Sequence, residues 1–101
     1  MRLVYAERAR QDIADIYDTI AKDNPPAAQR VEDSIRLVCE RLAEFPYASV
    51  ATDVPNVRRV PITQYPYTIF YRVEANVDTI EIARVIHAAR VKNLGKLPEV
   101  D

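Results

Sequence analysis

The sequence is poor in the residues on which several kinds of functional site depend. Its 101 residues include one glycine, one cysteine and one histidine. A single glycine excludes the glycine-rich loops that cradle nucleotide phosphates. One cysteine excludes an internal disulfide, and together with one histidine it cannot supply the ligands of a zinc site. We therefore expect no metal or other cofactor, and a reducing, cytoplasmic setting.

Long apolar runs are also absent. No stretch approaches the roughly 20 apolar residues of a membrane-spanning helix. Residues 1–5 are too few, and Arg2 brings a charge too early, for a signal peptide. The remaining composition, with 49 % hydrophobic and 29 % charged residues, is ordinary for a globular protein. The length indicates one domain, residues 1–101. Because no long apolar run is present, we expect no contact with a membrane.

The net charge of −1 conceals an uneven distribution. Residues 1–45 hold seven Lys/Arg and nine Asp/Glu, whereas residues 57–97 hold seven Lys/Arg and three Asp/Glu. A basic second half suggests an acidic partner or RNA. The alternative is a solvated surface of no special function, because charge patches alone are weak signals.

The first half of the chain reads as a short strand at residues 2–5 followed by two helices. The first helix spans residues 7 to about 22, and the second spans about 26–44 after an Asn24 cap. Apolar residues recur at helical spacing on both: Ala9, Ile13, Ile16 and Ile20 on the first, and Ala28, Val31, Ile35, Val38, Leu42 and Phe45 on the second. We expect these stripes to form the core, and Asp12, Asp15 and Asp18 to face solvent.

The second half is rich in β-branched and aromatic residues, which favour strands. We predict strands at residues 57–62, 67–73 and 77–87, with a long loop at 47–56 before them. Residues 74–76 have the length of a hairpin loop, in which Asn76 tolerates a left-handed conformation. Beyond His87 the sequence fits either a short helical turn that ends at Gly95 or a basic tail. Cys39 is expected to be a small core residue rather than a nucleophile.

These elements predict an α+β domain: an N-terminal strand, an antiparallel helical hairpin, then a three-stranded antiparallel β-meander. The helices would cover one sheet face and leave the other to display cations. The candidate partner-binding or target-binding residues are Arg58, Arg59, Arg72, Arg84, His87, Arg90 and Lys92. For Arg72 and Arg84 the alternative is a salt bridge to Glu74, Glu81 or the acidic helices.

Several short segments of this sequence resemble those of one protein family. They are Asp12-Ile13-Ala14-Asp15-Ile16-Tyr17, Asn24-Pro25-Pro26-Ala27-Ala28, Phe45-Pro46, Val57-Arg58-Arg59-Val60-Pro61, Tyr65-Pro66-Tyr67, Phe70-Tyr71-Arg72-Val73 and Arg84-Val85-Ile86-His87-Ala88-Ala89-Arg90. Their order over residues 1 to about 93 resembles the RelE/ParE superfamily of bacterial type II toxins, in particular its ParE-like, plasmid-stabilisation branch. The resemblance implies a toxin neutralised by a cognate antitoxin, with operator DNA contacted only through that antitoxin.

The resemblance leaves the target open between two activities. ParE-like members poison DNA gyrase and are not enzymes, whereas RelE-like members cut messenger RNA on the ribosome. The nucleases commonly carry an Arg three residues before the Tyr of the third strand, where this chain has Thr68, and some end in a His-Tyr pair, where His87 precedes Ala88. These departures favour gyrase inhibition. His87 would be catalytic only in a nuclease, and a histidine at a strand end is more often structural. A non-toxic binding module is the third hypothesis.

The core stripes carry one further expectation. A toxin that is neutralised by a bound protein should expose an apolar groove for that protein.

Overall fold

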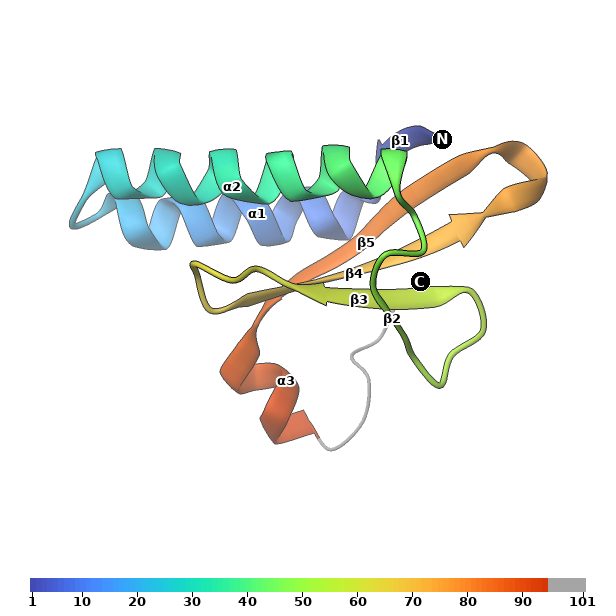
Figure 1. Ribbon diagram of the computed structural model, residues 1–101. Coiled ribbons are helices and arrows are strands. Elements are labelled where there is room, and N and C mark those ends of the chain that lie inside the picture. Colours follow the sequence, from blue (N-terminus) through green and yellow to red (C-terminus); the bar gives the residue numbers. More distant parts are fainter. Residues whose placement is uncertain (95–101) are drawn as a thin grey trace.

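The protein is an α+β domain, described by a computed structural model that covers the backbone of residues 1–94 and the side chains of residues 1–91 (Figure 1). Its elements are β1 (Arg2–Tyr5), α1 (Glu7–Ala21), α2 (Pro25–Glu44), β2 (Val50–Ala51), β3 (Val57–Pro61), β4 (Tyr67–Glu74), a 3₁₀ turn (Ala75–Val77), β5 (Thr79–His87) and α3 (Ala88–Leu94). The predicted fold class is confirmed.

The described strands form a five-stranded sheet in the order β1-β5-β4-β3-β2. β3, β4 and β5 are the antiparallel meander that the sequence predicts. The N-terminal strand lies beside β5 and runs parallel to it, with Arg2 opposite Thr79 and Tyr5 opposite Ile82. The predicted loop at 47–56 contains one element that sequence reasoning missed, the two-residue strand β2, which pairs with Arg58 and Arg59.

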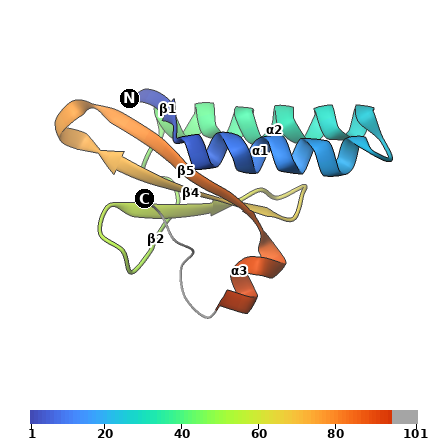
Figure 2. The same ribbon diagram turned by 180° about the vertical axis from the view of Figure 1, so that it is seen from behind.

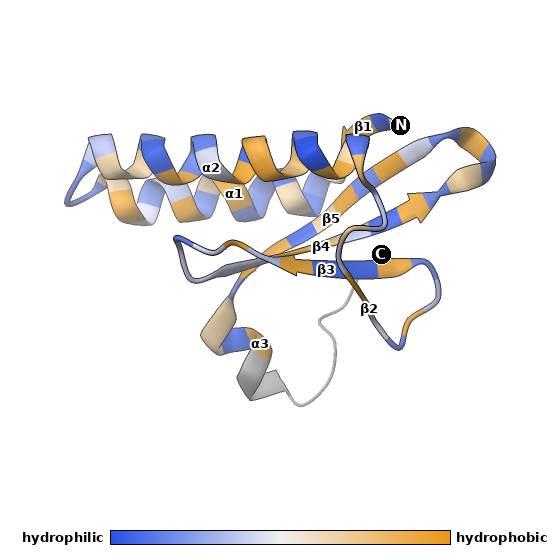
Figure 3. Ribbon diagram, viewed as in Figure 1, coloured by the Kyte–Doolittle hydropathy of each residue, from blue (hydrophilic) through white to orange (hydrophobic). Residues whose placement is uncertain are grey.

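The helical hairpin covers one face of the sheet, and α3 lies on the other side (Figures 1 and 2). Apolar residues recur along both long helices and along β4 and β5 (Figure 3). Those that meet between the layers form the core cluster: Ala9, Ile13, Val31, Ile35, Cys39, Leu42, Ile62, Ile69, Tyr71, Val73, Ile80, Ile82 and Val85. Cys39 is fully buried there, so its expected role as a core residue is confirmed.

The helix boundaries follow from local chemistry. The Asn24 side chain accepts a hydrogen bond from the Ala27 amide at 3.1 Å, and a proline occupies the first turn of α2, as predicted. Helix α1 begins after Ala6, which offers no side-chain cap, and has Glu7 in its first turn. The predicted core stripe fails at one position: Phe45, where α2 ends, is 63 % exposed.

The hairpin between β4 and β5 differs from its prediction. Val77 belongs to the 3₁₀ turn, so β5 begins at Thr79. The left-handed residue is Asp78, with φ of 48°, and not Asn76. The 3₁₀ turn shifts the tight reversal two residues further along, and Asp is one of the residues that tolerate this conformation. A bulge in β5 then changes the register between Phe70 and Tyr71, whose partners are Arg84 and Ile82.

Of the two expectations beyond His87, the helical turn is confirmed by α3. Gly95, its predicted end, lies outside the described residues. No helix in the described part of the chain is long and apolar enough to span a membrane.

Candidate functional site

The predicted basic residues do not form one exposed cluster. Arg84 is the clearest correction, because it is only 5 % exposed. Its Nε donates to Asp12 Oδ2 at 2.8 Å and its Nη2 to Asp12 Oδ1 at 3.2 Å. The helix pattern predicted that Asp12 faces solvent, and this prediction is wrong. The Asp12 side chain points from α1 toward the sheet. The salt bridge to an acidic helix, which was the alternative for Arg84, is the arrangement found.

Arg72 is also held by a carboxylate. Its Nη1 lies 3.3 Å from Glu81 Oε1, and the two residues are cross-strand partners on β4 and β5. The Arg72 side chain keeps 20 % of its surface exposed. β4 and β5 thus each carry an arginine that is paired with a carboxylate of another element.

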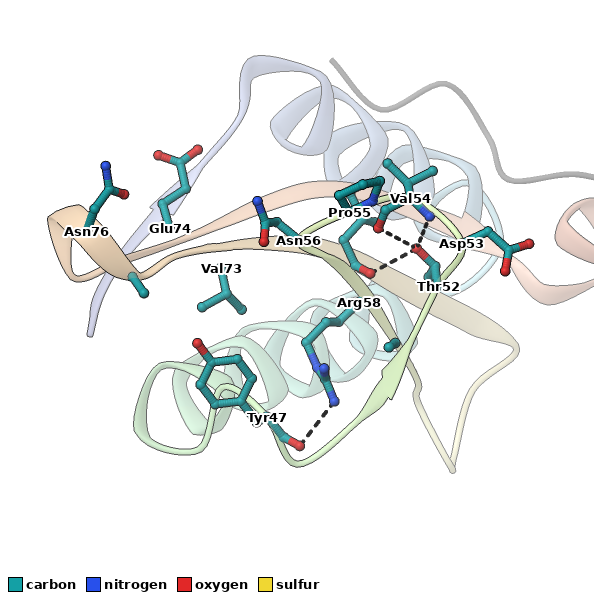
Figure 4. A pocket seen from close by; sticks show the side chains of 13 residues that line it. Tyr47, Thr52, Asp53, Val54, Pro55, Asn56, Arg58, Val73, Glu74 and Asn76 are labelled. Carbon is teal, nitrogen blue, oxygen red and sulfur yellow. Dashed lines mark hydrogen bonds between the residues drawn. The ribbon is translucent and has the colours of Figure 1, made fainter.

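Arg58 fastens the segment that follows α2 (Figure 4). Its Nη2 donates to the backbone oxygens of Tyr47 and Ser49, at 3.2 and 2.6 Å, and its guanidinium lies 5.4 Å from the centre of the Tyr47 ring. On the same segment, the Tyr71 hydroxyl donates to the Pro46 carbonyl at 2.8 Å and contacts the Ser49 hydroxyl. β3 and β4 therefore hold this segment through side chains rather than through a long β-ladder.

Two of the predicted arginines lie at the surface. Arg59 and Arg90 are exposed, and neither makes an ion pair with the described side chains. Lys92 lies in α3, but its side chain is outside the described residues. Arg59 sits on the central part of β3, whereas Arg90 lies beyond the end of β5. They are therefore displayed from different elements, and their contact with a partner stays a prediction.

His87 is exposed at the end of β5, where the strand becomes α3. Its Nδ1 accepts a hydrogen bond from the Ala89 amide at 3.1 Å. Its ring meets the Tyr67 ring edge-on, with centroids 5.5 Å apart. These two contacts hold the imidazole where β5 turns into α3, and a catalytic role for His87 stays a prediction.

Two surface hollows flank the segment held by Arg58 and Tyr71. The first encloses about 670 Å³ between residues 51–58 and the β4–β5 hairpin, and its rim carries both carboxylates and amides (Figure 4). The second is an apolar groove of about 550 Å³ between the C-terminal half of α2 and the end of β3. We call this second hollow the α2–β3 groove.

The α2–β3 groove is lined mainly by apolar side chains, including Val38, Val60 and Ile62. Leu37 and Phe45, on its rim, are 48 % and 63 % exposed. Among the described residues that line it, Arg41 is the only charged one. The sequence predicted an apolar groove but not its position. The signal that could have located it was Leu37, an apolar residue beside the predicted core stripe and one position before Val38.

Comparison with known proteins identifies the family. Residues 3–92 match the family of the ParE toxin of the type II toxin–antitoxin system, parDE. The chain is 33 % identical over 87 residues to the protein Y4kP of Sinorhizobium fredii, covering 86 % of this chain and 88 % of that protein. It is also 33 % identical over 91 residues to Toxin RelE2 of Caulobacter vibrioides, covering 89 % and 98 %.

Solved structures share the fold. The chromosomal ParDE toxin–antitoxin system from P. aeruginosa contains a chain that superposes with a TM-score of 0.75, at 24 % identity, over 86 % of this chain and 95 % of that one. The sequence match spans nearly all the described elements, from β1 to α3. The chain therefore belongs to the ParE toxin family within the RelE/ParE superfamily of type II toxin–antitoxin toxins.

Proposed function

We propose that this toxin acts by protein–protein contact on DNA gyrase rather than by cutting RNA. The observation that carries the proposal is the environment of Thr68. RelE-like nucleases commonly place an arginine there, whereas Thr68 is buried in β4 between its partners Pro61 and Ile86. A fixed cation beside the scissile phosphate is what such a nuclease needs to stabilise developing charge.

The other cations support the same reading. Arg72 and Arg84 are engaged by Glu81 and Asp12, and Arg58 by backbone oxygens. A cation already held by a carboxylate offers less charge to a phosphate. His87 retains Nε2 as a proton donor, so the ribosome-dependent ribonuclease remains the second hypothesis, with His87 as its acid or base.

We also propose that the cognate antitoxin occupies the α2–β3 groove. Leu37 and Phe45 expose apolar surface at its rim, and burying such surface drives protein association. The described residues of the lining include one cation and no carboxylate, which fits an apolar antitoxin segment with an acidic residue opposite Arg41. Operator DNA would be contacted through the antitoxin.

The test of the target is a supercoiling assay with purified gyrase and purified toxin, run beside induction of the toxin in a bacterial host. Gyrase inhibition should appear as lost supercoiling or accumulated cleaved DNA, with filamentous cells and intact messages. Unchanged gyrase activity at toxin concentrations that stop growth would reject the proposal. Cuts in translated messages that disappear in His87→Ala would establish the ribonuclease instead, and unimpaired growth with folded protein would indicate a binding module.

A further inference from the structure

The larger of the two hollows, between residues 51–58 and the β4–β5 hairpin, has no part in the function proposed above. We call it the loop–hairpin hollow (Figure 4). The segment after α2 contributes Phe45 and Ala48 to the α2–β3 groove, but Tyr47 and Ala51 to this hollow. No described residue lines both. The loop–hairpin hollow is therefore distinct from the surface assigned to the antitoxin.

Hydrogen bonds hold the walls of the loop–hairpin hollow in place. The Thr52 hydroxyl donates to the Val57 carbonyl at 2.8 Å and accepts from the Val54 amide at 3.2 Å. The Asn56 carbonyl accepts from the Val73 amide at 3.1 Å, which joins this loop to β4. A surface whose shape is fixed before binding loses less conformational entropy when a partner docks. The hollow is thus a preformed docking surface.

Apolar side chains are exposed along this hollow. Tyr47 and Val54 are 59 % and 41 % exposed, and Pro55, which follows Val54, is exposed as well. Single exposed apolar side chains are ordinary, but these three line one concavity. Because burial of apolar surface drives association, the hollow suits a partner that presents an apolar side chain.

The charges of the hollow indicate which partner fits. Asp53 of the loop and Glu74 at the end of β4 are exposed, and neither makes an ion pair with a described side chain. Arg58, the one cation among the described lining residues, is already engaged. Its guanidinium donates to the backbone oxygens of Tyr47 and Ser49 and lies over the Tyr47 ring. The unengaged charge is therefore negative, and it complements a basic partner.

We propose that the loop–hairpin hollow is the surface with which the toxin contacts its target, and that it takes a peptide segment with basic residues on either side of an apolar one. The apolar side chain packs against Tyr47 and Val54. The flanking Lys or Arg side chains pair with Asp53 and Glu74, which lie on opposite sides of Asn56 in Figure 4. This assignment rests on the proposed function in one respect, because it takes the target to be a protein.

The first experiment is an NMR titration of the isotope-labelled full-length chain with acetyl-Arg-Ala-Leu-Ala-Arg-amide. Matched peptides carry Glu or Gln in place of both arginines. We expect saturable shifts at the amides of residues 51–58 and 73–76, with tighter binding of the Arg peptide than of the other two. Binding should weaken as salt is added, because the ion pairs are exposed.

A double variant tests the two carboxylates. Asp53→Asn combined with Glu74→Gln should bind the Arg peptide about five- to tenfold more weakly, because two exposed ion pairs are lost. Asp18→Asn combined with Glu40→Gln removes the same two charges from exposed positions of the helical hairpin and should bind as wild type does. The proposal is overturned if the Arg peptide gives no saturable shifts at the hollow. Equal binding of the Glu peptide, or equal affinities of the two double variants, would also overturn it.

The link to the target is tested with the same two double variants in the gyrase supercoiling assay. Inhibition should weaken in Asp53→Asn/Glu74→Gln and persist in Asp18→Asn/Glu40→Gln. Equal inhibition by the two would show that the target binds elsewhere. If wild-type toxin leaves gyrase active, the proposed function fails, whereas the peptide titration still decides the chemistry of the hollow. Loss of antitoxin affinity in Asp53→Asn/Glu74→Gln would assign the hollow to the antitoxin and overturn the proposal.

Discussion

Asp12 of α1 reaches the sheet and binds β5 at two consecutive residues. One of its oxygens accepts both from Arg84 Nε at 2.8 Å and from the Val85 amide at 3.0 Å. β1 pairs with β5 only as far as Ile82, so no strand of the described chain lies beside this part of β5 on that side. The carboxylate thus accepts the hydrogen bond from the Val85 amide that a neighbouring strand would otherwise accept. A buried amide without an acceptor would be costly.

Replacing Asp12 with alanine should cost about 3–5 kcal/mol of unfolding free energy, because it leaves a buried guanidinium without this carboxylate. The pair is well shielded, with side-chain exposures of 6 % for Arg84 and 11 % for Asp12. Urea unfolding measures the loss. Asp15→Ala, three residues along on the exposed side of α1, is the control and should change stability by at most about 0.5 kcal/mol. Equal effects of the two substitutions would refute the assigned role.

Tyr71→Phe should destabilise the domain by about 1–2 kcal/mol while leaving its fold intact. The substitution removes the hydroxyl that donates to Pro46 and contacts Ser49, and leaves the buried ring in place. A drop in melting temperature of roughly 4–8 °C per kcal/mol is expected for a domain of this size. Tyr65→Phe provides the comparison, because that hydroxyl makes no side-chain hydrogen bond within the described residues. A Tyr71 variant as stable as the Tyr65 variant would contradict the proposed fastening.

Asn24→Ala should weaken the start of α2 by about 0.5–2 kcal/mol, since the Ala27 amide loses its acceptor. Asn24→Asp retains a side-chain oxygen and should stay close to wild type. Thermal unfolding followed by circular dichroism distinguishes the two variants. The cap explanation fails if the aspartate variant is as unstable as the alanine variant.

The pH dependence above neutrality should come from Cys39 and Tyr5. Burial raises the pKa of Cys39 to about 11 and is also the main cause that raises the pKa of Tyr5. An unfolded thiol ionises near pH 8.5, so the folded state favours the protonated thiol. This contribution is complete below about pH 8.5 and is lost as the pH rises toward 11.

Two measurements check that prediction. The folded protein at pH 8 should react with a thiol reagent only after denaturation, because Cys39 is fully buried. Urea unfolding at pH 8 and pH 10.5 should show a loss that is smaller in Cys39→Ala than in wild type. Rapid labelling of the native thiol, or an unchanged loss in the variant, would contradict the assignment.

The antitoxin surface can be tested with matched charge reversals on α2. Arg41→Glu places a carboxylate in the α2–β3 groove and should weaken antitoxin binding by more than about tenfold. Arg30→Glu makes the same charge change at an exposed position of the same helix, away from the groove, and should have little effect. Isothermal titration with the protein encoded beside the toxin gives both values. Similar losses of antitoxin affinity in the two variants would show that the antitoxin binds outside the α2–β3 groove.

Much of the fold was predictable because it is encoded locally. The apolar spacing of α1 and α2, the Asn24 cap and the β-branched strands each depend on neighbouring residues, and their combination in this order indicates the architecture. Errors arose where a residue's environment comes from a distant part of the chain. Helical spacing puts Asp12 beside the core stripe without showing that β5 lacks a neighbour there.

The candidate site was less predictable for the same reason. Charge counting treats each arginine as a free cation, yet Arg72, Arg84 and Arg58 are engaged by groups on other elements. Phe45 follows the periodicity of the core but lies at the end of α2, where the sheet no longer covers it. β2 is too short, at two residues, to show an alternating pattern.

The pairing of the first strand with β5 also bears on how the protein is made. Arg2 is translated well before its partner Thr79, because the two residues lie 77 positions apart in the sequence. The helical hairpin can form early from local contacts, but closing the sheet requires a distant segment and is correspondingly slow. A chain that stops before β5 lacks both the strand that pairs with β1 and the Arg84 that binds Asp12. A nascent or truncated chain therefore cannot present the finished sheet before β5 has been made.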